Sequence, residues 1–142
     1  MDIKRVLGDE AGQILGLVIK IGLVVIVVAL VIAEVAPLIW LRFSTIQDAE
    51  DVVGAVAQEY AFYHDQAKAV ETAGSKLSMM GYSEEEVKES VVEFLPAGAA
   101  EKQSVKVTVV KYANTLVTRH ISFLKKFARV ATTKESGLGT TR

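Results

Sequence analysis

The chain has 142 residues, a formal net charge of −1 and no cysteine, so it is large enough for one modest domain beside a membrane span. After Leu41, thirteen Lys and Arg balance thirteen Asp and Glu, which excludes the basic excess that a general nucleic-acid or anionic-lipid binder needs. The lack of cysteine excludes a disulfide framework and thiol catalysis.

An apolar run near the N-terminus predicts a transmembrane helix over residues 14–41. Its centre reads IGLVVIVVALVIA, and about 20 such residues cross roughly 30 Å of hydrocarbon. Lys20 can extend toward the N-terminal headgroups, while Trp40 and Arg42 mark the far interface. The competing interpretation is a cleaved secretory signal, but the apolar region of a signal is normally about 7–15 residues long.

The charges that flank the run predict its orientation. Lys4 and Arg5 precede it, whereas acidic residues follow Arg42. By the positive-inside rule, residues 1–13 are a cytoplasmic segment and residues 42–134 form a domain outside the cytoplasm. The chain is therefore predicted to be a single-pass protein of the cell membrane, with the lipid bilayer as its first partner.

Two charged residues inside the run predict how the span packs. Lys20 and Glu34 share one helix face but lie about 21 Å apart, so they cannot pair within one helix. Pairing between staggered copies would set the register of side-by-side helices, and Gly12 with Gly16 offers a small-residue contact near the same end. The alternative is that both charges reach opposite interfaces. Pro37 is expected to kink the helix without ending it.

Beyond the span, an amphipathic pattern predicts that the same helix continues to Met79. Its second half would then cover a small domain, although a coiled coil is the competing interpretation. The apolar stripe recurs at alternating steps of three and four residues: Ile46, Ala49, Val53, Val56, Tyr60, Tyr63, Ala67 and Val70.

Short strands are predicted after a helix stop at Gly81. Ser83, followed by three glutamates, has the form of an N-cap with acidic residues in the first turn. Residues 91–95, 104–112 and 127–133 are predicted strands, with a short helix or an irregular connection between the last two. Residues 135–142 are expected to form a flexible tail. The predicted fold class is α+β: a long N-terminal helix packed on a small antiparallel sheet of about three strands.

No arrangement of residues predicts catalysis, a metal site, a cofactor or a small-molecule substrate. His64 and His120 lie on separate elements, and neither has a partner at metal-ligand spacing. The aromatic residues at 60, 62 and 63 are interpreted as core, and the basic residues at 125, 126 and 129 as a solvated face.

The segment Asp9-Glu10-Ala11-Gly12-Gln13, directly before the apolar run, resembles the start of Flp and TadE-type pilins of the tight-adherence secretion system. Residues 105–133, a VxVxV strand, a connection and a final strand with Ala-Thr-Thr, are similar to the end of TadE-like proteins. The resemblance implies the lollipop plan of type IV pilin-like proteins. It also implies a structural role as a minor pilin or pseudopilin-like component of a pilus or secretion system, assembled with itself or other pilin-like subunits in cell adhesion.

The resemblance also implies prepilin-type processing after Gly8 or Gly12, and here the sequence departs from the family pattern. Such proteins usually carry a Glu five residues after the cleaved glycine, whereas this chain has Gln13 or Leu17 there. The departure favours a pseudopilin-like relative that keeps its N-terminus. The alternative function is a membrane-tethered extracytoplasmic binding or accessory module that forms no filaments.

Overall fold

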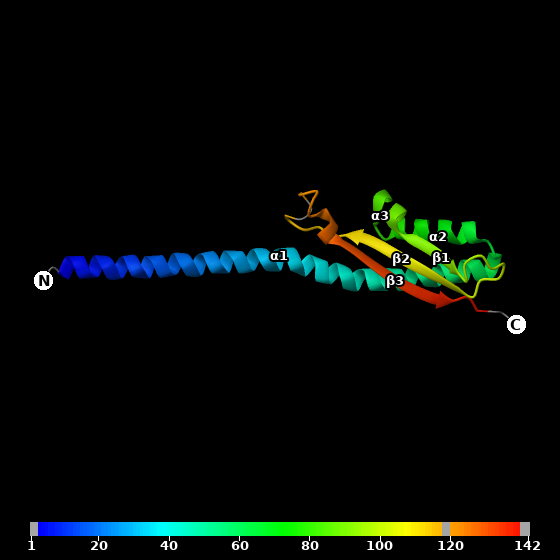
Figure 1. The fold of residues 1–142 in the computed structure, drawn as a ribbon, viewed down its shortest axis with the longest axis horizontal. Helices are drawn as coiled ribbons and strands as arrows, with labels where there is room; N and C mark the ends of the chain where they lie inside the picture. Colours follow the sequence, from blue (N-terminus) through cyan, green and yellow to red (C-terminus); the bar gives the residue numbers. More distant parts are fainter. Residues whose placement is uncertain (1–2, 118–119, 140–142) are drawn as a thin grey trace.

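The computed structural model describes residues 3–117 and 120–139, and it describes side chains from residue 11 onward within these ranges. A single long helix, α1 (Ile3–Tyr63), leads into a small head made of short helices and one sheet (Figure 1). The head contains α2 (Gln66–Met79), α3 (Glu84–Glu89), β1 (Val91–Leu95), β2 (Ser104–Tyr112), the 3₁₀ helix η1 (Lys125–Ala128) and β3 (Arg129–Gly137). The predicted α+β arrangement is confirmed.

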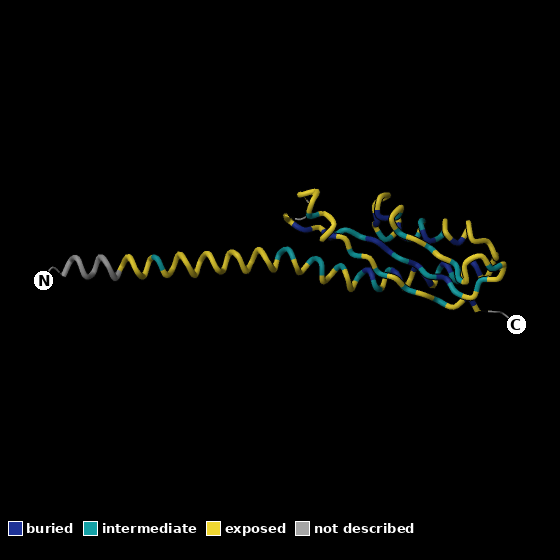
Figure 2. The backbone as a smooth tube through the Cα atoms, viewed as in Figure 1, coloured by how far each residue is buried: buried dark blue, intermediate teal, exposed yellow. Residues whose placement is uncertain are grey.

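The first half of α1 stands apart from the rest of the chain. Figure 2 shows residues 11–32 as a bare rod that is exposed except at Gly16, whereas buried positions begin at Thr45 in the second half. Among the described residues α1 is the one helix long and apolar enough to cross a membrane, and none of its most apolar stretch is buried. This helix is compatible with a single membrane anchor. It also runs through Pro37 without ending.

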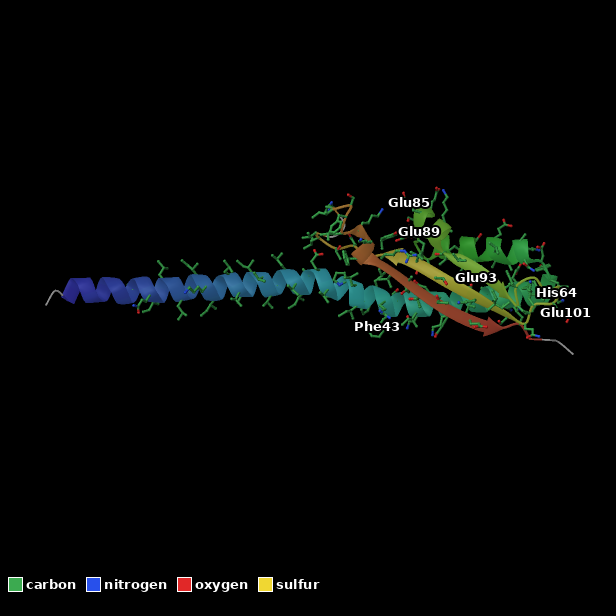
Figure 3. All side chains as sticks on the ribbon, in the orientation of Figure 1. Phe43, His64, Glu85, Glu89, Glu93 and Glu101 are labelled. Carbon is green, nitrogen blue, oxygen red and sulfur yellow. The ribbon has the colours of Figure 1, made fainter. Side chains whose placement is uncertain are left out.

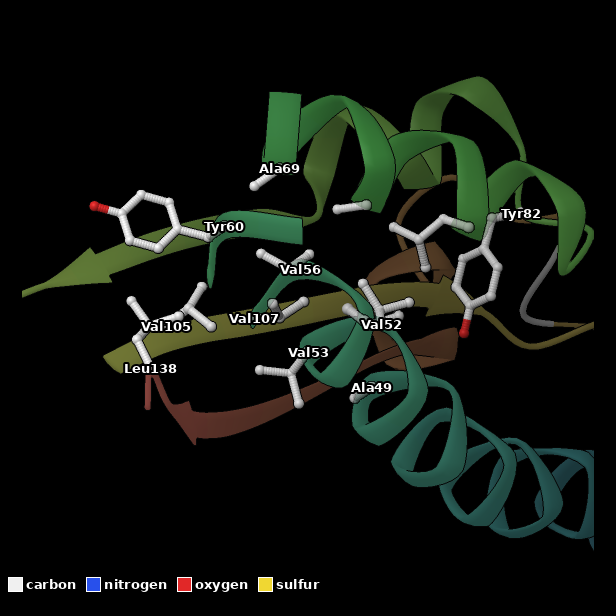
Figure 4. Close-up of a cluster of buried hydrophobic side chains, with 13 residues drawn as sticks. Ala49, Val52, Val53, Val56, Tyr60, Ala69, Tyr82, Val105, Val107 and Leu138 are labelled. Atoms are coloured by element: carbon white, nitrogen blue, oxygen red, sulfur yellow. The ribbon is translucent and has the colours of Figure 1, made fainter. Parts of the chain in front are cut away.

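The core forms where the second half of α1 lies across the sheet (Figure 4). The predicted stripe is confirmed at Ala49, Val53, Val56 and Tyr60, all of which are buried. Facing residues come from β2, whose Val105, Val107 and Val109 are fully buried, and from α2, which turns back beside α1 (Figure 1). α2 buries three residues one turn apart: Ala69, Ala73 and Leu77.

The prediction of one helix as far as Met79 is wrong, because α1 ends at Tyr63 and α2 begins at Gln66. His64 adopts a left-handed backbone with φ 53°, and the Asp65 side chain accepts hydrogen bonds from the amides of Ala67 and Lys68. An aspartate that caps a new helix in this way ends the old one without a Gly or Pro. The predicted stripe therefore fails after Tyr60: residues 63, 67 and 70 are exposed.

The three strands form one antiparallel sheet in the order β1-β2-β3. β2 is longer than β1, and two of its unpaired amides are satisfied by the segment before β1. The amide of Val110 donates to the Ser90 hydroxyl at 3.1 Å, and that of Tyr112 donates to the Glu86 carboxylate at 2.9 Å. Glu86 also completes the predicted N-terminal cap with Ser83. The side chains of Glu86 and Ser90 thus bind the part of β2 that extends beyond β1.

The C-terminal boundaries differ from the predicted ones. The predicted strand at 127–133 lies at Arg129–Gly137, and Phe127 belongs to η1. Residues 135–137 are strand and Leu138 is buried, so the expectation of a tail starting at Glu135 is wrong for them. The amide of Leu138 donates to the Gln103 carbonyl at 2.7 Å, which ties this end to the start of β2. Residues 140–142 of the predicted tail lie outside the described residues.

Candidate membrane and assembly surface

The residues predicted for helix packing lie on the uncovered half of α1. Neither Gly12 nor Gly16 has an atom within 4 Å of the position that a Cβ would occupy, so both are open to a neighbouring helix. Lys20 is exposed on the same half. Gly8, the other predicted processing residue, lies within α1, but its surroundings fall outside the described side chains.

The predicted interface anchors follow on the same helix. Trp40 is 78% exposed, and the Arg42 side chain is exposed as well. Phe43 beside them is also exposed, and Figure 3 shows it at the start of the head. Two residues after Phe43, the buried hydroxyl of Thr45 shares a hydrogen bond of 3.0 Å with the hydroxyl of Thr132 in β3. Among the described side chains of α1, Thr45 is the first that is buried, and it follows directly after the predicted anchors.

Glu34 is bonded within its own chain. Its Oε1 accepts a hydrogen bond of 2.7 Å from the backbone amide of Val117, which lies 83 positions later in the connection between β2 and β3. The structure thus brings this connection alongside the predicted span. Pairing of Glu34 with Lys20 of a second copy stays a prediction, but one carboxylate oxygen already has a partner.

The same connection exposes a group of large apolar side chains, which we call the loop patch. Its members are Leu116 (64% exposed), Val117 (46%), Ile121 (44%), Phe123 (69%) and Phe127 (60%). The ammonium group of Lys126 lies 5.3 Å from the ring centre of Phe123 and 5.8 Å from that of Phe127. The sequence predicts the irregular connection but not this exposure, although five large apolar residues in a loop are a signal for it.

The basic residues at 125, 126 and 129 are exposed, as predicted, and two of them pair with acids of α3. Arg129 Nε donates to Glu89 at 3.2 Å, and the Tyr112 hydroxyl donates to the same carboxylate at 2.8 Å. These bonds, the one from Tyr112 first, lower the pKa of Glu89 below its ordinary value, and Glu89 in turn raises the pKa of Tyr112. Lys125 lies 3.8 Å from Glu85. Such exposed pairs orient side chains and contribute little to stability.

Tyr82 links α1 to the far side of the core. Its hydroxyl donates to Asp48 at 2.7 Å, and the Lys111 ammonium lies 4.2 Å from its ring centre. Burial, followed by the hydrogen bond to Asp48, raises the pKa of Tyr82 far above the ordinary value for tyrosine. This contact fixes the helix against the segment between α2 and α3.

The two histidines lie apart, as the sequence predicts. His64 directly follows α1 and meets the Tyr60 ring edge-on at 5.9 Å, at the end of the head where Figure 3 labels it. His120 is exposed in the β2–β3 connection. Within residues 11–117 and 120–139, no three His, Asp or Glu side chains are grouped as metal ligands would be. The interpretation of three aromatics as core holds for Tyr60 alone, because Phe62 is 79% and Tyr63 51% exposed.

No family model, curated protein sequence or solved structure matches this chain. The functional assignment therefore depends on the geometry described above: an uncovered apolar helix that is compatible with a membrane anchor and continues into a small α+β head.

Proposed function

We propose that the chain is a membrane-anchored structural subunit, a minor pilin or pseudopilin-like component of a tight-adherence type assembly. In this role the apolar run 14–41 anchors the chain in the cell membrane, the N-terminus is cytoplasmic and the head lies outside. The observation that carries the proposal is the continuity of α1, which has one bare apolar half and one half packed on the sheet. A rod of this kind couples the position of the head directly to the packing of helices in the membrane.

The bare half of α1 supports self-association for a physical reason. Lipid supplies no hydrophobic drive for helix pairing, so such helices associate through close backbone approach and polar contacts. The open surfaces of Gly12 and Gly16 permit close approach, and exposed Lys20 offers a polar contact nearby. We therefore assign the surface around Gly12, Gly16 and Lys20, in the N-terminal half of the span, to contact with neighbouring subunits.

Cysteine crosslinking tests this assignment, because the natural chain has no cysteine to remove. Single cysteines at each position from 12 to 28 are introduced into the full chain and oxidised in the native membrane. We expect disulfide dimers to peak every three to four residues, in phase with Gly12 and Gly16, since one helix face packs against its neighbour. Glu101→Cys in the head is the control for random collision.

Two outcomes would contradict the proposal. Uniformly weak crosslinking, at the level of the control, would identify a tethered monomeric module. Strong crosslinking without any periodicity would show crowding in the membrane rather than a specific contact. Electron microscopy of the detergent-extracted protein then distinguishes filaments from small oligomers.

A further inference from the structure

The loop patch lies beside the span rather than at the outer end of the head. Figure 1 shows the β2–β3 connection projecting from the head toward the bare half of α1. The hydrogen bond between Val117 and Glu34 fixes this placement. Glu34 lies seven residues before Leu41, which is about 10 Å along the helix. The connection therefore reaches back past the predicted end of the span.

This contact locates the edge of the hydrocarbon layer. The 28 residues from 14 to 41 cover about 42 Å, whereas the layer is roughly 30 Å thick, so about 12 Å of the run must lie outside it. A loop backbone exposed to hydrocarbon would leave polar groups unsatisfied. The edge on the head side therefore lies near Glu34 and not near Leu41. Lys20 then lies about 9 Å inside the opposite edge, from where its side chain extends toward the headgroups.

At that depth the loop patch meets the interfacial layer of the bilayer. Elements that lie on a membrane surface bury Trp, Phe or Leu at the boundary between headgroups and acyl chains and keep Lys or Arg on their polar side. Phe123 and Phe127 supply the rings, Lys126 lies over both of them, and Trp40 on α1 lies about 9 Å beyond the hydrocarbon edge. In water these five apolar side chains would stay 44–69% exposed, which is unfavourable.

We propose that the loop patch inserts into the interfacial layer of the bilayer, so that the head rests on the membrane surface at a fixed depth and orientation. The inference rests on the membrane anchor of the proposed function, but not on filament assembly. It names the β2–β3 connection as a second membrane-binding element besides α1. The bilayer is the occupant because Glu34 of the span itself holds the loop.

Tryptophan fluorescence measures this depth, because Trp40 is the chain's one tryptophan. On a Trp40→Phe background, one tryptophan is placed at Phe123 in the loop patch, at Phe62 at the far end of α1, or at Val24 in mid-span. Phe127→Trp serves as a second loop variant. The replaced side chains are exposed, so the fold is retained. Each full-length variant is reconstituted in phosphatidylcholine vesicles with plain or acyl-brominated chains.

We expect bromine to reduce emission from Val24→Trp and from both loop variants by roughly twofold or more, because these indoles lie within reach of the acyl chains. Phe62→Trp should keep its emission and be quenched by aqueous iodide instead. The difference between Phe123→Trp and Phe62→Trp is the decisive comparison, since both replace an exposed phenyl ring on the same head.

Each contrary result has its own meaning. If Val24→Trp is not quenched by bromine, the anchor fails and the proposed function fails with it. If Val24→Trp is quenched but the loop variants respond to iodide as Phe62→Trp does, the loop patch faces water and the inference alone is overturned. If the loop variants are shielded from both quenchers until the protein is diluted in lipid, a second copy covers the patch, which also overturns it.

Discussion

The two halves of α1 place the same kinds of residue in different surroundings. Val25, in the first half, is 61% exposed, whereas Val52, in the second half, is fully buried against the head. Both belong to one uninterrupted helix. Within the first half, residues 21–33 are apolar on all sides, while the second half carries acidic residues such as Glu50 and Asp51 on its outer side. In the proposed role, lipid therefore surrounds the first half of this helix, whereas protein and water surround the second half.

The comparison shows what stabilises each half. β-branched residues form helices weakly in water, and lipid favours the helix because every backbone amide must bond internally there. The second half instead depends on packing, with Val52 and Val56 against the sheet and against α2. Substitutions in one half should therefore leave the other half intact.

An aspartate placed in each half should separate the two environments. Val52→Asp buries an unpaired carboxylate in the core and should destabilise the head by at least about 4 kcal/mol. Val25→Asp should disfavour membrane insertion by about 3 kcal/mol and change the stability of the head by less than about 0.5 kcal/mol. Near-ultraviolet circular dichroism and limited proteolysis report on the head, and extraction with alkaline carbonate reports on insertion.

Two other outcomes would contradict the separation of α1 into two environments. If Val25→Asp unfolded the head, the bare half of α1 would be packed on protein rather than on lipid. If Val52→Asp released the chain from the membrane, anchor and head would fold as one unit. Val25→Leu and Val52→Ile are the matched controls, since they keep an apolar side chain at each position.

High pH should weaken the contact between Tyr82 and Asp48 on the packed half. The pKa of Tyr82 in the folded head lies above its ordinary value of 10.0, so above about pH 10 the unfolded chain releases a proton that the folded chain keeps. Stability from this group is complete below pH 10 and falls by about 1.4 kcal/mol for each further pH unit. Tyr82→Phe should lose about 1–2 kcal/mol at pH 7 and show a flatter alkaline slope.

Thermal unfolding of the head in detergent at pH 7, 10 and 11 measures both effects. Asp48→Asn is the matched control, because it keeps an acceptor for the tyrosine hydroxyl but removes the negative charge. If wild type and Tyr82→Phe had equal alkaline slopes, another group would be titrating, and the burial of this hydroxyl would not control the pH dependence.

The sequence predicts those elements whose residue pattern lies entirely within one short stretch of the chain. The alternation of residues 104–112 and the turn residues around 91–95 give the first two strands with their observed bounds. Ser83 before three glutamates predicts the N-cap of α3, which the structure completes as a capping box with Glu86. The end of α1 was missed because Asp65 ends a helix by capping the next one, and a heptad stripe continues through such a break. Asp65 followed by helix-forming residues is nevertheless a signal that could have been used.

The candidate surface was predicted only in part, for a related reason. The apolar run and the exposed Trp40 and Arg42 beside it follow from local composition, and their place in a membrane stays a prediction. The bond between Glu34 and Val117 joins positions 83 residues apart, and no local pattern specifies it. The strand register that carries β3 to Gly137 is likewise set by pairing with Ser104, where β2 begins, because the final residues contain little apolar sequence of their own.

Substitutions at the boundary between the two halves of α1 should have the smallest effect on the stability of the head. Thr45 is fully buried, and its hydroxyl donates to the Arg42 carbonyl at 3.1 Å or shares a hydrogen bond of 3.0 Å with Thr132. Thr45→Val keeps the shape and removes these bonds, so we expect a loss of about 1 kcal/mol. Thr132→Val should cost less, because Thr132 is only partly buried and water can replace the bond.

A double-mutant cycle isolates the bond itself. Thr45→Val combined with Thr132→Val should show a coupling of about 0.5–1 kcal/mol in the thermal unfolding of the head, since each hydroxyl loses the same partner. Ser104 and Glu135, which share a hydrogen bond of 2.6 Å on the exposed side of the sheet, provide a control pair with a smaller coupling. A coupling near zero for Thr45 and Thr132 would mean that apolar packing alone fixes α1 to β3, and that the packed half begins at Ala49 rather than at Thr45.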